Sequence, residues 1–173
     1  MLEAAIFVVF PFCMAYAAVS DMLSMTIANR VSLLLAGSFI LIAPLTGMDW
    51  HVYGMHLAAG SGMLVITFGL FAAGGMGGGD AKLIAATAFW MGLGPELMQY
   101  LLYSAAAGGV LTLSILMYRK SALAVYTGHH RLLRNLADRD VGVPYAIALG
   151  IGGMLTFPQS ALAAWAIGRV AGV

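Results

Sequence analysis

Charge is scarce in this chain of 173 residues: Asp, Glu, Lys and Arg make up only 9%, whereas 62% of the residues are hydrophobic and the mean hydropathy is +0.95. The surface of a soluble domain must meet water and rarely has so little charge. The net charge of +1 also leaves no basic face for a nucleic-acid partner. The composition therefore argues against nucleic-acid binding and predicts an integral membrane protein.

Cysteine is almost absent. Cys13 is the only one and lies inside an apolar run, so an internal disulfide, a zinc ribbon and a thioredoxin-type CxxC site are all excluded. His129 and His130 are adjacent in a segment predicted to lie at the membrane surface, an arrangement that seldom binds a metal. The sequence therefore predicts neither a metal nor a cofactor.

Long apolar runs recur from one end of the chain to the other. They lie near 4–20, 27–47, 55–73, 81–94, 97–118 and 144–167, and a transmembrane helix needs about 20 apolar residues. They predict an all-α integral membrane protein, a bundle of about six transmembrane helices that forms a single membrane-embedded domain over residues 1–173. The fourth run is short, roughly 21 Å at a rise of about 1.5 Å per residue, so its glycine-rich start is expected below the membrane surface.

The basic residues are distributed unevenly along this pattern. Six crossings place the segments 21–30, 74–80 and 119–143 on one side of the membrane, and only Arg169 among the basic residues falls on the other. The first side holds Arg30, Lys82, Arg119, Lys120, Arg131, Arg134 and Arg139. Because positive charge is retained in the cytoplasm, this side is predicted to be cytoplasmic and both termini periplasmic.

Two acidic residues, Asp21 and Asp80, are predicted to lie at that cytoplasmic face. Asp21 closes the first apolar run and Asp80 opens the fourth. Two neighbouring carboxylates share a proton, so that one can activate water while the other donates a hydrogen bond to a carbonyl oxygen. The alternative is structural: Asp80 as a helix N-cap and Asp21 as a partner of Arg30. The pattern of these two residues alone leaves both interpretations open.

The glycines before Asp80 favour the catalytic interpretation. Gly77, Gly78 and Gly79 directly precede the carboxylate, and glycine lets a loop approach another backbone closely. A peptidase holds its substrate in an extended conformation against exposed backbone groups. A simple linker would explain the glycines but not the acid and the amine of Lys82 that follow them.

The stretch "GGGDAKL", which contains Asp80 and Lys82, fits the pattern GxGD followed by Asp-x-Lys-Leu. It resembles the motif of the bacterial type IV prepilin peptidases, a family of GxGD aspartic proteases. The stretch "SDMLSMTIAN", with Asp21 and Asn29, is similar to the family's segment after the first helix. The family often has Ile-Pro-Asn there with an arginine before it, whereas this chain has Ile-Ala-Asn and no such arginine.

A third segment, "VPYAIALG", matches the Pro-Tyr segment that opens the last helix in this family and contains Pro144 and Tyr145. The resemblance thus covers essentially the whole chain. It implies that residues 1–173 form one peptidase domain in the bacterial inner membrane, with Asp21 and Asp80 as the catalytic pair. It also implies supporting or substrate-loop roles for Gly77, Gly78, Gly79, Lys82, Asn29, Pro144 and Tyr145.

The resemblance further implies a substrate and a subtype. Longer members of the family carry a cytoplasmic extension, often with CxxC pairs, that is linked to N-methylation, and this chain has neither. It resembles the short, peptidase-only form associated with Tad/Flp pili. The implied partners are prepilins and pseudopilins, whose short basic leader is removed at the cytoplasmic face, together with membrane lipid.

Two other functions also fit membrane-embedded acids. An ion-coupled transporter uses such groups to relay protons or bind a cation, and a pilus or secretion assembly subunit needs no chemistry at all. A transporter site lies near the midplane of inverted repeats, whereas both aspartates here are predicted near one face and no repeat is evident. The sequence does not indicate an oligomeric state.

Overall fold

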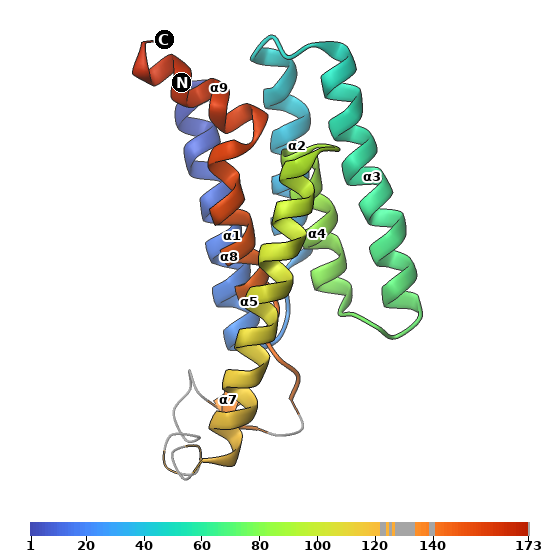
Figure 1. The fold of residues 1–173 in the computed structure, drawn as a ribbon, viewed down its shortest axis with the longest axis vertical. Coiled ribbons are helices and arrows are strands. Elements are labelled where there is room, and N and C mark those ends of the chain that lie inside the picture. The colour runs from blue at the N-terminus through green and yellow to red at the C-terminus, as the bar shows by residue number, and fades with distance from the viewer. Residues whose placement is uncertain (122–123, 125, 127–133, 139–140, 173) are drawn as a thin grey trace.

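The computed structural model describes residues 1–121, 124, 126, 134–138 and 141–172. Within these residues every regular element is helical (Figure 1). The helices are α1 (Leu2–Ser24), α2 (Asn29–Leu45), α3 (Trp50–Ala72), α4 (Gly78–Met91), α5 (Pro95–Lys120), α7 (Arg134–Ala137), α8 (Ala146–Thr156), the 3-10 helix η1 (Phe157–Gln159) and α9 (Ala161–Ala171). The expected all-α fold is confirmed.

Each of the six predicted runs contains helix, but the helices differ in length. Over the described residues, α1, α3 and α5 are long and apolar enough to cross a membrane, and the bent pair formed by α8 and α9 makes a fourth span if it is counted as one. By contrast, α2 has 17 residues and α4 only 14. The structure is that of a helical membrane protein, and the number of six spans remains a prediction.

The sixth run, expected as one helix over 144–167, is broken. α8 begins at Ala146, and a bend of 51° separates it from α9. The break follows from its residues, because Pro158 has no backbone N–H to donate. Ser160 then starts the next helix as its N-cap, accepting from the Ala163 N–H at 3.4 Å. The expectation of one continuous last helix was wrong.

Helix α4 lies at the centre of the bundle. Nine of its residues are buried, because α2 and α3 pack on one part of its surface and α8 on another. α5 in turn packs mainly on α8, and α1 packs on α8, α9 and α2. The molecule therefore has two groups of helices, α2–α3–α4 and α1–α5–α8–α9, which meet along α4 and between α1 and α2.

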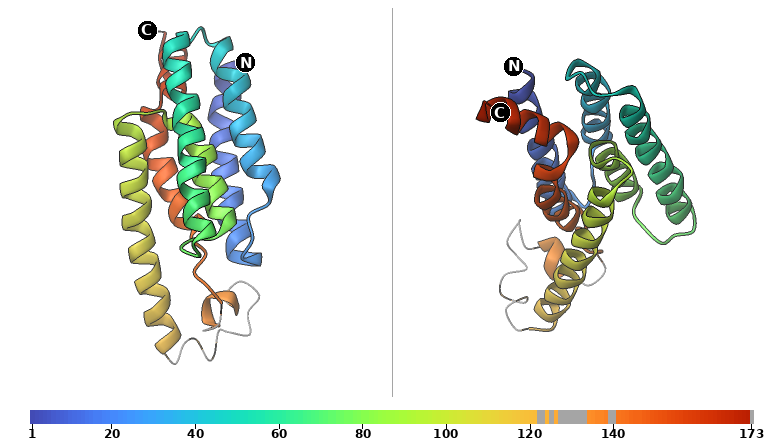
Figure 2. Two further views of the ribbon diagram at one scale, coloured as in Figure 1. Left: turned by 90° about the vertical axis from the view of Figure 1, so that its right-hand side faces the viewer. Right: turned by 45° about the horizontal axis from the view of Figure 1, so that its top comes forward.

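The two termini lie together at one end of the molecule (Figures 1 and 2). The end of α1, the start of α4 and the end of α5 point the other way, and α5 extends farthest in that direction (Figure 2). The end of α1, which carries Asp21, and the start of α4, which carries Asp80, therefore both point away from the termini. The segment 129–140, for which a short helix at the membrane surface is expected from its leucines and arginines, lies partly outside the described residues, and α7 covers 134–137 of it.

Candidate active site

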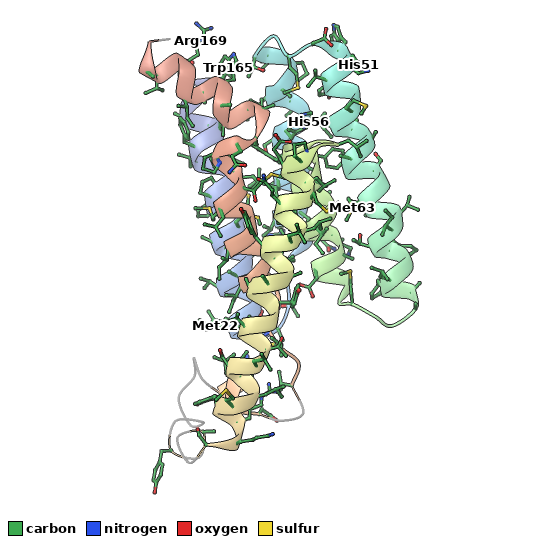
Figure 3. The ribbon with its side chains drawn as sticks, viewed as in Figure 1. Met22, His51, His56, Met63, Trp165 and Arg169 are labelled. Carbon is green, nitrogen blue, oxygen red and sulfur yellow. The ribbon has the colours of Figure 1, made fainter. Side chains whose placement is uncertain are left out.

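Asp21 belongs to the buried face of α1. The buried residues of this helix are Ile6, Phe10, Cys13, Met14, Ala17 and Asp21, a spacing of three and four that marks one side of a helix. Asp21 is the last of the series and is 7% exposed. Its neighbour Met22 lies toward the end of α1 that faces away from the termini (Figure 3). The apolar periodicity of α1 thus turns a carboxylate into the bundle.

The partner of Asp21 comes from the far end of the sequence. The backbone N–H of Ala146, the first residue of α8, donates to Asp21 Oδ2 at 3.0 Å. That N–H is one of the donors that a helix start leaves unpaired. Among the described residues no ion pair joins Asp21 to Arg30. The alternative in which Asp21 pairs with Arg30 was therefore wrong. Asp21 instead accepts a hydrogen bond from the start of α8.

Asp80 is held against the glycine run. The N-cap of α4 is Gly77, so Asp80 is the third residue of the helix and not its N-cap as considered from the sequence. A Cβ atom on Gly77 would lie 2.9 Å from Asp80 Oδ2. The other oxygen, Oδ1, is buried and has no hydrogen-bond partner within the described part of the chain. The absence of a side chain at Gly77 thus makes room for the carboxylate.

Asp21 and Asp80 come from different groups of helices but lie near enough for the charge of Asp21 to act on Asp80. The contact between α4 and the α1–α2 connection is close, since a Cβ on Gly79 would lie 3.2 Å from Ile27 Cβ. Gly78 in turn lies against the Phe71 ring, where a Cβ atom would come within 3.1 Å of the nearest ring carbon. The glycines therefore allow the first turn of α4 to approach its neighbours.

The α1–α2 connection has a defined shape. Met25 adopts a left-handed conformation with φ of 53° and ends α1. Ser20 Oγ then donates to Thr26 O at 2.9 Å and ties the connection back to the helix. Ala28, at the position where the resembled family often has proline, has φ of −64° and ψ of 132°. A proline ring fixes φ near this value, so the missing proline has not changed the local backbone.

Lys82 and Asn29 form a second link across the site. Lys82 Nζ donates to Asn29 Oδ1 at 2.9 Å. Asn29 is the first residue of α2 and Lys82 lies two residues after Asp80, so this bond joins the starts of two helices beside the carboxylate pair. The resemblance implied supporting or substrate-loop roles for both residues, and in the structure they are hydrogen-bonded to each other.

Pro144 and Tyr145 precede α8 directly. The carbonyl of Pro144 accepts from Ile147 N at 3.3 Å, and Tyr145 is the N-cap residue. The Tyr145 ring fills the space over Gly108 of α5, where a Cβ atom would collide with it. The Pro-Tyr segment therefore fixes the start of α8, whose first N–H reaches Asp21.

Sequence reasoning missed the residues that attach the segment between α5 and α8. Arg119 donates through Nε to Leu136 O at 2.9 Å and through Nη2 to Val141 O at 2.9 Å and Gly142 O at 3.0 Å. Asn135 Nδ2 donates to Leu23 O at 2.8 Å, at the end of α1. Both side chains donate to backbone carbonyl groups. Because every residue has such a group, the sequence does not indicate which of them accept these hydrogen bonds. The sequence analysis used Arg119 only as evidence for the orientation in the membrane, whereas the structure shows that it also stabilises this segment.

A metal centre finds no support in the described residues, which contain no group of three or more His, Cys, Asp or Glu side chains placed to hold an ion. His129 and His130 lie outside them. The chemistry available to this site is that of two carboxylates, a lysine and the backbone groups of helix starts.

The fold and site together define a helical membrane protein in which Asp21, which is buried, and Asp80, which is partly buried, lie where the two groups of helices meet. The type IV leader peptidase family matches residues 8–113, a span that contains both aspartates and the glycine run. The chain belongs to this family of proteases. No curated protein and no solved structure matches the chain.

Proposed function

We propose that this protein is an aspartic endopeptidase that removes the short basic leader from Flp-type prepilins and pseudopilins at the cytoplasmic face of the bacterial inner membrane. Asp21 and Asp80 are its catalytic residues. The observation that carries the proposal is the pair itself: buried Asp21 and partly buried Asp80, from different helices, near enough for the Asp21 charge to act on Asp80, in a member of a leader peptidase family. Structural acids seldom pair within a membrane bundle, because each burial is costly.

The reaction needs one proton shared between the two carboxyl groups. The ionised one takes a proton from water, whose oxygen attacks the carbonyl carbon of the scissile bond, while the protonated one donates a hydrogen bond to the carbonyl oxygen. The tetrahedral intermediate then loses its amine as the C–N bond breaks and the nitrogen receives a proton from the pair. The proton count returns to its starting value, so no cofactor is consumed.

The neighbouring residues have supporting roles in this proposal. Gly77, Gly78 and Gly79 let a substrate backbone approach Asp80. Lys82 and Asn29 hold the starts of α2 and α4 together. Pro144 and Tyr145 set the start of α8, and with it the donor to Asp21.

The proposed topology has both termini in the periplasm and the segment 119–143 in the cytoplasm. Its support is the basic cluster and the common location of the termini (Figure 1). In a Cys13→Ser background, His130→Cys should react with a membrane-impermeant thiol reagent only after the cells are opened, whereas Ala171→Cys, at the exposed end of α9, should react in intact spheroplasts. Labelling of residue 130 from outside contradicts the topology.

Cleavage of a purified prepilin is the decisive test. The protein in detergent should convert an Flp-type prepilin into a shorter product and a free basic leader, both identified by mass spectrometry. With S-adenosylmethionine present, the new N-terminus should carry no methyl group, as expected for a peptidase-only enzyme. If the prepilin remains intact while a proteoliposome assay detects proton-coupled uptake, the transporter interpretation replaces this one. If both assays are negative, a role in assembly replaces it.

A further inference from the structure

An apolar groove runs between α2 and α3, with α4 as its floor. Both helices pack on α4 but contact each other only sparsely, and α3 lies on the outside of the bundle (Figure 1). This α2–α3 groove has a volume of about 350 Å³, within the range of about 300–1,000 Å³ that small-molecule sites occupy. Its apolar lining residues are Leu33, Ala36, Leu64, Ala85, Ala86 and Phe89.

Phe89 closes the inner end of the α2–α3 groove. A Cβ atom on Gly60 of α3 would collide with the Phe89 ring, so this ring bridges α4 and α3. From Lys82, which also lines the groove, α4 advances roughly 10 Å to Phe89 at about 1.5 Å per residue. The groove is therefore short, apolar and closed at one end by an aromatic ring.

The open end of the groove lies at the level of the membrane surface. α1 is long enough to cross a membrane and ends at Ser24, and α2 begins shortly afterwards at Asn29. Lys82 Nζ donates to Asn29 Oδ1 at 2.9 Å, so Lys82 lies at the same level. Both residues line the groove and are exposed. The groove thus leads from the headgroup region into the hydrocarbon.

Lys82 brings an uncompensated positive charge to this entrance. Its partner Asn29 is neutral, and no carboxylate forms an ion pair with Lys82 among the described residues. An ammonium group has three protons to donate, and Asn29 keeps its Nδ2 group as a further donor. Two such donors beside a positive charge are the groups that bind a phosphate.

Ser32 adds a polar group on the wall of the groove. It lines the groove, and its buried Oγ has no hydrogen-bond partner in the part of the chain that the structure describes. A buried polar group without a partner calls for an explanation. Ser32 follows Asn29 by about one turn of α2, on the side of the hydrocarbon. The ester carbonyls of a glycerophospholipid lie just below its phosphate, in the same order.

The groove faces away from the carboxylate pair. At about 100° per residue, Lys82 and Phe89 project from a side of α4 roughly opposite to Asp80. A peptide chain held between Asp21 and Asp80 therefore does not extend into the groove, whereas lipid reaches it from the membrane.

We propose that the α2–α3 groove binds one molecule of an anionic glycerophospholipid. The phosphate contacts Lys82 Nζ and Asn29 Nδ2, an ester carbonyl accepts from the Ser32 hydroxyl, and one acyl chain follows the apolar wall to Phe89. A zwitterionic headgroup brings its own ammonium group close to Lys82 and is therefore bound less well. The lipid fills the space between α2 and α3 and takes no part in cleavage.

The test is native mass spectrometry of the protein released from membranes of equal parts phosphatidylglycerol and phosphatidylethanolamine. Wild type should retain one lipid, with phosphatidylglycerol enriched about fivefold, which corresponds to about 1 kcal/mol for one basic residue at an anionic lipid surface. Lys82→Gln keeps a donor for Asn29 but removes the charge, so it should retain both lipids equally. Ala36→Phe fills the groove and should retain neither, and Ser32→Ala should lower the retention of both.

A second groove in the molecule supplies the matched control. It lies between α5 and α8 and is larger, about 470 Å³, but none of its lining residues in the described part of the chain is charged. Ala107 lines it and is half-buried, as Ala36 is in the α2–α3 groove. Ala107→Phe should therefore retain phosphatidylglycerol as wild type does. Lys82→Gln covers the case in which Ala36→Phe does not fold.

Several results overturn the proposal. One is the same phosphatidylglycerol enrichment in wild type and Lys82→Gln, and another is equal lipid loss in Ala36→Phe and Ala107→Phe, which indicates lipid bound without a site. Displacement of the lipid by excess glycerol phosphate, which has no acyl chain, is a third. If wild type retains no lipid, while Ala36→Phe abolishes binding of an Flp-type prepilin or of a second copy, that partner occupies the groove instead. Because the measured quantity is bound lipid, failure of the proposed peptidase function leaves this test unaffected.

Discussion

The two aspartates of the site have opposite surroundings. Asp21 ends the buried face of a 23-residue helix and already accepts a backbone N–H from Ala146. Asp80 starts a 14-residue helix, follows a run of glycines and has one buried oxygen without a donor among the described residues. One carboxylate is thus fixed by the scaffold, whereas the other lies on a backbone that permits adjustment. A peptidase that must admit a protein chain benefits from this difference, because the substrate can move one partner without disturbing the other.

The same contrast extends to the helices that carry them. Asp21 belongs to the group α1–α5–α8–α9 and Asp80 to the group α2–α3–α4, which meet along α4 and between α1 and α2. A small movement between the groups therefore changes the separation of the carboxylates. Glycines at Gly77 and Gly79, where a side chain would press on Asp80 or Ile27, lie where that movement would be absorbed.

The largest expected effect comes from removing either carboxylate. Asp21→Asn and Asp80→Asn keep shape and most hydrogen-bonding capacity but cannot share a proton, so each should lower kcat on the order of 10³-fold or more. The double variant should be no worse than either single one, because the two residues act as a unit. The measurement is prepilin cleavage at matched levels of inserted protein.

As the control for these two variants, Asp49→Asn removes an acid that caps α3 at the other end of the molecule. It should cleave at the wild-type rate. Near-normal turnover by Asp21→Asn or Asp80→Asn contradicts the aspartic mechanism and leaves the carboxylates a structural role.

A second, smaller loss of activity is expected from a substitution that displaces Asp80, the aspartate that follows the glycines. Gly77→Ala introduces a Cβ at 2.9 Å from Asp80 Oδ2, a contact that displaces the carboxylate, and a shift of about 1 Å in a catalytic group can cost on the order of 10²-fold. Gly69→Ala, where a Cβ meets nothing within 4 Å, is the matched control. Equal activity of the two variants would show that Asp80 tolerates displacement and would remove the contrast drawn above.

A third effect should be moderate. Lys82→Ala and Asn29→Ala each remove one end of the 2.9 Å hydrogen bond between α4 and α2. Lys82 is exposed, so we expect only a severalfold loss of kcat/KM in each case. If the bond itself matters, the double variant should lose no more than the larger single loss. Strictly multiplicative losses would assign the two residues independent roles.

The smallest expected effect is that of chelation. Excess EDTA should leave the cleavage rate unchanged, and Cys13→Ser should also cleave normally, because neither a metal nor a thiol takes part in the proposed reaction. The assay is run before and after metal-free dialysis. Inactivation that one added metal reverses would place the chemistry at a metal site, with His129 and His130 the first residues to substitute.

Much of the fold could be predicted because hydropathy is a strong local signal in a membrane chain. The apolar runs located the ends of α1 to α5 to within five residues, and Pro95 lies at the start of α5. The break in the sixth run was not predicted, although Pro158 and Ser160 lie within that run. The run is so apolar that these two helix-ending and helix-starting residues were given too little weight. A count of apolar residues predicts that a helix is present more reliably than it predicts whether that helix is continuous.

The site, too, could be predicted only in part from the sequence. Asp21, Asp80 and the glycines could be found from the sequence because they interrupt apolar runs. Their hydrogen-bond partners could not, since the donor to Asp21 is a backbone N–H and the acceptors of Arg119 are backbone carbonyls.

The hydrogen bond between Ala146 and Asp21 also sets a condition on biosynthesis. It joins residues 125 positions apart, and chains enter the membrane from the N-terminus as they are made. Asp21 is therefore translated early, yet its donor arrives only with the last part of the chain. A partly synthesised molecule already contains both carboxylates but lacks the group that orients one of them. If Asp21 and Asp80 act as proposed, the order of synthesis delays a complete site until α8 is in place.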